Sequence, residues 1–271
     1  MTTTAVAALL DLGFTEIEAR LFVELTQLGP STGYRLSKAV GKAAANTYAA
    51  LETLAQKGAV FVDEADGAKI WRAAPGPELI AALEARHAQK REQALAALAT
   101  LKAPEAEPRL YALKTPDQVY ARARAMIAAA KSILIFDLFP EPFSALEPDL
   151  ARAAQAGVRV VGQIYGPVAT PVETVTAPGG LRQAAVWPGQ QVTLIADARE
   201  HMTALLSRDG ERCRQAVWSD SIYLACVQHS GLAAELVLVA QQTGQTLSFD
   251  PSLFASGAPG LGDLTAPSFG D

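Results

Sequence analysis

The stretch from Gly41 to Val60, G-K-A-A-A-N-T-Y-A-A-L-E-T-L-A-Q-K-G-A-V, decides the fold of the first part of the chain. Its glycines at 41 and 58 stand where residues just past helix C-termini are expected, so a helix lies between them. Small and apolar residues at i, i+4, i+7 and i+11 predict its buried stripe: Ala44, Tyr48, Leu51 and Ala55. The opposite face has no large apolar group and comprises Lys42, Asn46, Ala49 and Thr53, with Ala45 at its margin. Such a face is not needed to build a core. It suits a helix that lies in a DNA major groove.

Two helices are predicted before this one. Thr15 and Glu18 form a capping-box pattern that begins a helix with one apolar face: Ile17, Leu21, Leu25 and Leu28. The Gly-Pro pair at 29–30 ends this helix, and Ser31 or Thr32 can cap the next one. The segment 1–14 is expected to add a short lead helix.

A hairpin is predicted after the glycine at position 58. The runs Ala59–Val62 and Lys69–Arg72 have β-like composition, and the polar segment 63–68, which contains Asp66-Gly67, joins them as a turn. Helix, helix, turn, helix and hairpin is the element order of a winged helix-turn-helix.

The quoted motifs resemble the TrmB family of transcription regulators. The resemblance rests on L-L-D-L-G-F-T-E-I-E-A-R-L-F-V-E-L (9–25), G-P-S-T-G-Y-R-L-S-K-A-V-G (29–41) and T-Y-A-A-L-E-T-L-A-Q-K-G-A-V (47–60). It implies a linker helix and a C-terminal effector domain after the winged helix. Members of the family often have arginines at the start of the recognition helix, where this chain has Ala44, Ala45 and Asn46.

Direct reading of DNA bases is predicted for Asn46. Its amide can pair with the N7 and N6 groups of one adenine, and neighbouring alanines can contact thymine methyl groups, so an A/T-containing half-site is expected. The alternative, that Asn46 only caps or solvates its helix, stays open. The residues expected to contact DNA are Arg35, Lys38, Lys42, Ala45, Asn46, Ala49, Thr53, Lys69 and Arg72.

Composition suggests two modest domains. The chain has 271 residues, half of them hydrophobic, and a net charge of −5. Residues 1–75 carry 7 Lys and Arg against 8 Asp and Glu, whereas residues 103–271 carry 12 against 17. The first part is therefore nearly neutral, and its small basic patch predicts a shallow salt dependence of DNA binding.

A cytoplasmic protein with reduced thiols is expected. The first residues, M-T-T-T-A-V-A-A-L-L-D, resemble no secretory signal, and no apolar run reaches the length of a membrane span. The two cysteines, Cys213 and Cys226, are too few for a disulfide framework or a tetrahedral zinc site. No cofactor and no metal site are predicted.

A linker helix is predicted from about Pro77 to Leu101. Leu79 and Leu83 give it one apolar end, Leu98 and Leu101 the other, and its middle is polar. This pattern favours a short antiparallel or crossed helix pair in a homodimer. A single amphipathic helix that packs on its own chain is the alternative.

The second domain is predicted to be an α/β sheet, because strand-like and helix-like segments alternate. Strands are expected at Arg109–Leu113, Ser132–Phe139, Val158–Tyr165, Arg182–Val186, Val192–Ala196 and Thr203–Ser207. Helices are expected at Pro116–Ala130, Pro148–Ala156 and Ser221–Ala240, and the segment 166–180 is expected to be a loop. The predicted organisation, α+β followed by α/β, is a winged helix-turn-helix (1–75), a linker helix (76–103), an effector or dimerisation domain (104–243) and a flexible or surface-draped tail (244–271).

This layout is similar to the phospholipase-D-like domain of TrmB-type regulators. In this chain the residues at the motif positions of the enzymes predict that the domain is not catalytic. The enzyme motif is H-x-K-x4-D. If Asp197 takes the aspartate position, the histidine and lysine positions fall on Gln190 and Val192, and neither can attack or bind a phosphate. The histidines are scattered without ligand spacing, and no phosphate-binding loop is present. No catalytic residue is predicted.

A pocket for a small polar molecule, such as a sugar, is predicted where the strands of the second domain end. Ligands bind beyond the carboxyl ends of strands in open α/β sheets, and aromatic, carboxylate and amide groups suit a polar ligand. The candidate effector-binding residues are Asp137, Phe139, Gln163, Tyr165, Asp197 and Trp218. Ordinary capping or core roles are the alternative for each.

The leading hypothesis is a dimeric DNA-binding regulator that senses a small effector. The alternative is a winged-helix protein whose second domain only dimerises or contacts a protein partner. A third hypothesis, a phosphodiesterase tethered to DNA, is disfavoured by Gln190 and Val192.

Overall fold

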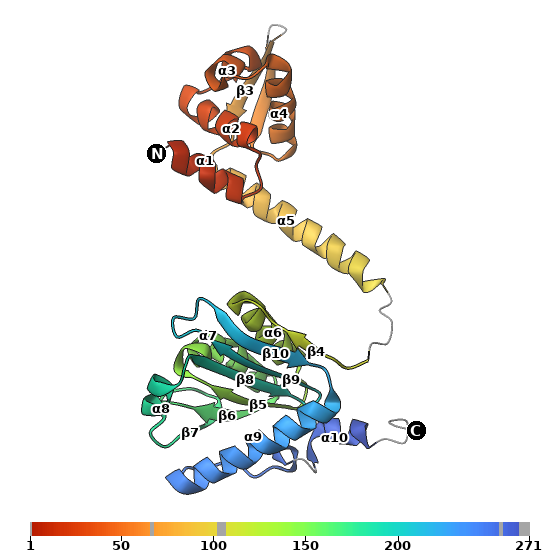
Figure 1. Cartoon of the computed structure of the whole chain (residues 1–271). Helices are drawn as coiled ribbons and strands as arrows, with labels where there is room; N and C mark the ends of the chain where they lie inside the picture. Colours follow the sequence, from red (N-terminus) through yellow and green to blue (C-terminus); the bar gives the residue numbers. More distant parts are fainter. Residues whose placement is uncertain (1, 66–67, 102–106, 255–256, 266–271) are drawn as a thin grey trace. The chain divides into compact units, whose positions relative to one another are not determined.

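The computed structural model describes the chain except for residues 1, 66–67, 102–106, 255–256 and 266–271. The chain divides into two compact units, 1–104 and 105–271. Each unit is described by itself below and is drawn in Figure 1.

The first unit is a winged helix-turn-helix followed by a long helix. Its helices are α1 (Thr2–Asp11), α2 (Glu16–Leu28), α3 (Gly33–Val40), α4 (Ala44–Gln56) and α5 (Gly76–Ala99). Its strands are β1 (Ser31–Thr32), β2 (Val60–Ala65) and β3 (Ala68–Ala73), which pair in the antiparallel order β1-β3-β2. The predicted element order, including the lead helix, is confirmed.

The helix ends follow the predicted capping chemistry. The Thr15 side chain accepts from the Glu18 N–H, and the Glu18 carboxylate accepts from the Thr15 N–H at 2.7 Å, which completes the capping box. Thr32, not Ser31, caps α3 through the Arg35 N–H. Gly41 ends α3 with φ of 65°, a left-handed conformation that glycine adopts without strain.

The buried stripe of α4 differs from the predicted one. Leu51 is buried and Ala55 partly buried, but Ala44 and Tyr48 are exposed. The buried residues of α4 are Thr47, Ala50, Leu51 and Leu54. The prediction was wrong because it placed the large side chain of Tyr48 in the core, which rotated the predicted buried face about the helix axis. The methyl and hydroxyl of Thr47 are accommodated inside, where the hydroxyl donates to the Ala43 carbonyl at 3.2 Å.

The hairpin strands are longer than predicted, because polar residues after Val62 continue the ladder. Val62 pairs with Trp71 and Glu64 with Lys69. Trp71 is fully buried and joins the core of this unit. The predicted Asp66-Gly67 turn lies outside the described residues.

Helix α5 belongs to the core at one end only. Pro77 lies in its first turn, as predicted, and Leu79 is buried in the winged-helix core with Leu83 packed against it. From Gln89 to Ala99 every residue of the helix is exposed. The expectation that Leu79 contacts a second copy is therefore wrong.

The second unit is a seven-stranded mixed sheet with helices on both faces (Figure 1). The strand order is β4-β10-β9-β8-β5-β6-β7, and β5, β6 and β7 are parallel. The strands are β4 (Leu110–Ala112), β5 (Ile133–Leu138), β6 (Arg159–Ile164), β7 (Glu173–Thr176), β8 (Gln190–Ala196), β9 (Glu200–Leu206) and β10 (Cys213–Ser219). The helices are α6 (Pro116–Ala129), α7 (Pro140–Gln155), α8 (Gly180–Val186) and α9 (Ile222–Thr243).

Two apolar layers separate the faces of this sheet. Alternate residues of β5, such as Leu134 and Phe136, pack with α6 and α7, whereas Ile133 and Ile135 pack with α9. Phe136 lies against Gly162 on β6, where a Cβ would come within 2.4 Å of its ring. By its position in this alternation, Asp137 lies on the α9 face.

Several predicted elements of the second unit are wrong. Helix α7 begins at Pro140, eight residues before the predicted start at Pro148, which lies inside the helix. The segment Arg182–Val186 is the end of helix α8 and not a strand. Strand β7 lies within the predicted loop, and β10 was not predicted because its adjacent arginine and glutamine interrupt the polar and apolar alternation that indicates a strand.

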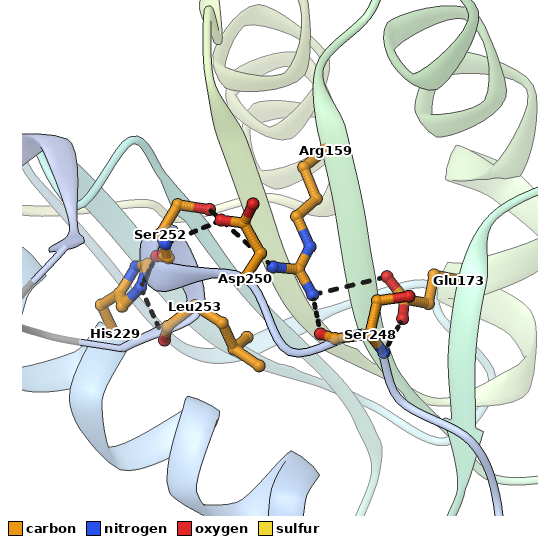
Figure 2. A network of polar contacts seen from close by, with 7 residues as sticks. All are labelled: Arg159, Glu173, His229, Ser248, Asp250, Ser252 and Leu253. Atoms are coloured by element: carbon orange, nitrogen blue, oxygen red, sulfur yellow. Dashed lines mark hydrogen bonds and ion pairs between the residues drawn. The ribbon is translucent and has the colours of Figure 1, made fainter.

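The described part of the tail is draped on the surface, one of its two predicted states. It contains a 3₁₀ turn, η1 (Pro251–Leu253), and helix α10 (Pro259–Leu264), and Leu247 and Leu253 are buried against α9. Figure 2 shows its polar attachments. The Arg159 guanidinium contacts the Ser248 carbonyl and Glu173, and Nε2 of His229 contacts the Ser252 carbonyl at 2.9 Å.

Helix α9 has the length and composition of a membrane-spanning helix, the one such helix among the described residues. Eight of its residues are buried against the second unit. A core helix meets the same criterion, and the packing of α9 is that of a core helix.

Candidate DNA-binding and effector sites

The exposed face of α4 is made of small and polar side chains. Ala45, Asn46 and Ala49 are exposed, as predicted, and Thr53 is half-buried with its hydroxyl on the Ala49 carbonyl. Glu52 is also exposed and was not predicted to lie on this face. Because Thr47, Ala50 and Leu54 point inward, the centre of the exposed face runs through Ala45, Ala49 and Glu52. Asn46 lies on its flank.

Three basic side chains lie on α3 and in the turn before α4. Arg35, Lys38 and Lys42 are exposed, as predicted. Nζ of Lys38 lies 5.5 Å from the ring centre of Tyr34, a side chain that is 63% exposed and was not predicted to take part. These groups form an open edge that can approach a phosphate backbone.

One predicted phosphate contact is already paired. Nζ of Lys69 lies 2.9 Å from a carboxylate oxygen of Glu52 and 3.9 Å from Glu64. Both carboxylates raise the pKa of Lys69, and the hydrogen bond that Lys69 donates to Glu52 contributes most. Arg72, on the same strand, is exposed. Among the described residues Arg72 makes no ion pair, so it can approach a phosphate, whereas Lys69 is paired to the recognition helix.

Four of the predicted effector residues lie together at the carboxyl ends of β5 and β6. Asp137 pairs in register with Gln163, and both side chains are buried. Nε2 of Gln163 donates to the Tyr165 hydroxyl at 2.9 Å, and the Phe139 and Tyr165 ring centres are 4.4 Å apart. Their proximity is confirmed, and a role in binding a ligand stays a prediction.

The cluster is desolvated and rich in acceptors. Burial raises the pKa of Asp137 to about 7; the Tyr165 hydroxyl opposes this change and the Glu235 carboxylate adds to it. Burial and the same carboxylates raise the pKa of Tyr165 above its usual range. Among the described residues, Oδ1 of Asp137 and Oε1 of Gln163 are buried without a hydrogen-bond partner. Such groups are uncommon in folded proteins and mark places where a ligand can add hydrogen bonds.

Two residues of this site were missed in the sequence. The Gln191 amide on β8 donates to Oδ2 of Asp137. The Trp187 ring is 41% exposed, with its centre 6.4 Å from that of Phe139. Both line a hollow of about 320 Å³ on the α9 face of the sheet, together with Thr193, Thr203, Ala204, Leu205, Gln215 and Val217. Antiparallel β8 brings Gln191 beside Asp137, which the order of the chain alone does not show.

Asp197 and Trp218 do not belong to the cluster, contrary to prediction. Strand β8 runs antiparallel to β5, so Asp197, just after β8, lies at the opposite end of the strands from the cluster. There its carboxylate accepts from the three backbone N–H groups of residues 131–133. Trp218 packs with the α6 and α7 layer, stacks on Tyr111 at 5.1 Å and donates to Glu200. The prediction failed because it placed the end of the strand before Asp197 beside the ends of β5 and β6, which holds only for parallel strands, and because it did not predict the strand that carries Trp218.

The residues at the positions of the phosphodiesterase motif have structural roles. Val192 is fully buried in the core beneath α7. Gln190 donates to the Arg208 carbonyl at 3.3 Å. Neither can act as a nucleophile or as a cation, and no group of three or more metal-ligating side chains occurs among the described residues.

Two protein-family models match the chain. One, described as sugar-specific transcriptional regulator TrmB, matches residues 9–82. The other, described as transcriptional regulator TrmB, EBD N-terminal subdomain, matches residues 109–229. Together they span the winged helix and most of the second unit.

One curated relative is the uncharacterized protein YrhO of Bacillus subtilis (strain 168), 26% identical over 159 residues. The match spans 58% of this chain and 58% of that protein.

Among solved structures, the archaeal chromatin protein TrmBL2 is 18% identical, covering 86% of this chain and 96% of that one, with a TM-score of 0.42. NucT from Helicobacter pylori is 9% identical, with a TM-score of 0.38, and covers 49% of this chain and 98% of its own. Nuc from Salmonella typhimurium, a phospholipase D family member, is 16% identical, with a TM-score of 0.35, and covers 53% and 99%.

Proposed function

The chain belongs to the TrmB family of transcriptional regulators, and from this premise we propose that it binds a double-stranded DNA operator as a homodimer and senses a small polar effector through its second unit. Operator binding requires the compartment that holds the DNA, so we infer a cytoplasmic location.

The exposed face of α4 is the observation that carries the DNA-binding proposal. Its side chains are short, so the helix backbone can come close to base edges, and Asn46 can pair with one adenine. Arg35, Lys38 and Lys42 then hold phosphates on either side of the groove. An A/T-containing half-site is the expected target.

Two substitutions separate base reading from phosphate binding. Asn46→Ala is expected to cost about 1–3 kcal/mol at one base position and to relax the preference there, because one bidentate pair is lost. Lys42→Ala is expected to weaken all sequences about equally and to reduce the salt slope by roughly one. Both are measured by binding to a library of half-site mutants. Uniform weakening by Asn46→Ala, or none, excludes direct readout by this residue.

A groove beside α5 supports the homodimer. It is a hollow of about 420 Å³ lined by apolar side chains, Leu12, Phe14, Ile80 and Leu83, and by the charged side chains Lys57, Glu84, Arg86 and Lys90. The same face of α5 continues to Leu98, and Leu101 follows just after the end of the helix; the two side chains are 61% and 69% exposed. In an antiparallel pair of α5 helices centred near residues 90 and 91, Leu98 of one copy meets Leu83 of the other, and Leu101 meets Ile80. Each copy then fills the groove of its partner.

Sedimentation tests this arrangement. Changing both Leu98 and Leu101 to Lys is expected to shift the protein towards monomer, because two charges must enter an apolar groove. The matched control changes Ala85 and Gln89 to Lys, on another part of the exposed surface of α5. An unchanged dimer in the leucine variant moves the interface to the second unit.

The cluster of Asp137, Gln163 and Tyr165 supports an effector site. A buried carboxyl group with an unpaired oxygen, next to a hollow lined by an exposed tryptophan, is typical of a ligand pocket. Sugars are among the polar ligands that such groups bind. A thermal-shift screen with small polar molecules tests this role, since a ligand that binds only the folded state raises the midpoint. If no compound does so, the second unit serves only dimerisation or a protein partner.

A further inference from the structure

The buried cluster at the ends of β5 and β6 has hydrogen-bond acceptors that its own donors do not reach. Among the described residues, its unpaired atoms, Oδ1 of Asp137 and Oε1 of Gln163, are both acceptors. The contact from Nε2 of Gln163 to the Glu235 carboxylate is long, at 3.4 Å, so it is a weak hydrogen bond. A ligand that completes this site must bring N–H or O–H groups.

The charged groups acting on the cluster have one sign. Asp137 on β5 is influenced by the Glu235 carboxylate of α9. The remaining polar groups beside it, from Gln163 on β6, Tyr165 just after β6 and Gln191 on β8, are neutral. The guanidinium of Arg208 reaches the C-terminal end of α8, where it donates to the carbonyls of Ala185 and Trp187 at 2.6 and 2.7 Å. The site is therefore complementary to a positive charge.

Aromatic rings stand on the side of the cluster that faces the hollow. Phe139 lies between Tyr165 and the exposed Trp187. Aromatic faces attract organic cations, whereas a small metal ion prefers a shell of oxygen ligands. Because no group of three metal-ligating side chains was found in the described parts of the chain, an organic cation fits better than a metal ion.

The Gln191 amide shows how a ligand can reach Asp137. It is half-buried, lines the hollow and donates an N–H to the carboxylate. It thus occupies the path between the hollow and Asp137. A ligand N–H entering from the hollow can replace this donor without leaving the carboxylate unpaired.

We propose that the effector site takes a small organic cation, an amine or a guanidine, whose N–H groups donate to Asp137 and Gln163 while its carbon chain lies against Trp187. This inference rests on the proposed effector role of the second unit. It assigns the charge of the ligand, and it makes Asp137 and Glu235 the residues that determine specificity.

The test compares agmatine and 1,4-diaminobutane with 1,4-butanediol, an uncharged analogue of the diamine, by calorimetric titration of the full chain. Because hydrogen bonds to a charged group are the stronger ones, the cations are expected to bind about tenfold or more tightly than the diol. A cation also competes with the proton on Asp137. With a pKa of about 7 in the free protein, its affinity is expected to be about tenfold lower near pH 6 than near pH 8.

Asp137→Asn is expected to abolish both the preference for the cations and the pH dependence. Glu235→Gln, at an exposed position that tolerates a neutral side chain, is expected to weaken the preference, and Glu141→Gln, an exposed carboxylate on α7 outside the site, is expected to leave it unchanged. Equal binding of diol and cations overturns the assignment of charge but keeps the effector site. If none of the three compounds binds, both the assignment and the site are overturned. A cation preference that survives in Asp137→Asn also overturns the assignment.

Discussion

Asp137→Asn is expected to stabilise the ligand-free protein, and more so at higher pH. The folded state holds this carboxyl group in a desolvated site, with a pKa of about 7 against 3.8 for an exposed aspartate. Between these two values the unfolded chain releases the proton and the folded chain keeps it, so stability falls as pH rises. The unfavourable contribution is absent below about pH 4 and complete above about pH 7.

The size of the effect follows from the two pKa values. At about 1.4 kcal/mol per pH unit, the difference between 3.8 and about 7 gives a ceiling of about 4 kcal/mol above pH 7. At about pH 5 the same reasoning gives under 2 kcal/mol. Asparagine has the same shape and keeps an acceptor for the Gln191 amide, so it removes the charge with little change in packing. The gain should therefore be about 1–3 kcal/mol larger near pH 8 than near pH 5.

Urea unfolding of both proteins at the two pH values measures this difference. A Trp71→Phe background leaves Trp187 and Trp218 as fluorescence probes, both within the second unit. Subtracting the gain at one pH from the gain at the other cancels changes in packing that do not depend on protonation. A gain of equal size at both pH values, or a loss confined to high pH, refutes the desolvation of Asp137 as its cause.

Two further expectations concern Lys69 and the tail. Glu52→Gln should release Lys69 for a phosphate contact, so affinity for all DNA sequences should rise and the salt slope should steepen by about one. Anisotropy titrations at several salt concentrations measure the slope, and an unchanged slope contradicts this role. Gly260→Ala should lift α10, because its Cβ would lie 2.0 Å from the Ala198 carbonyl oxygen, and hydrogen exchange at the Gly260 amide should accelerate. Gly262→Ala is the control, since its Cβ meets nothing within 4 Å. Equal exchange in the two variants would show that the close approach of Gly260 to the Ala198 carbonyl does not hold α10 in place.

Local patterns were sufficient for the winged helix. The capping box at Thr15 and the glycine at 41 act over a few residues, so their effect on helix ends can be read directly from the chain. The same holds for the alternating strands and helices that begin the second unit, where β5 and β6 stand as predicted. The exposed side chains of Asn46 and Ala49 were also found this way, because a polar or small residue opposite a leucine is seldom buried.

Pairings between distant segments could not be predicted by the same means. Nothing near Glu52 in the chain indicates that Lys69 neutralises it, since the hairpin brings the two together. The antiparallel direction of β8 removes Asp197 from the effector cluster and supplies Gln191 in its place. Periodicity records which residues share a face of one element, but the direction of a neighbouring strand depends on the connection between strands and on burial across the whole sheet. The ionisation of Asp137 depends on the same packing, because its pKa is set by the elements that exclude water from it.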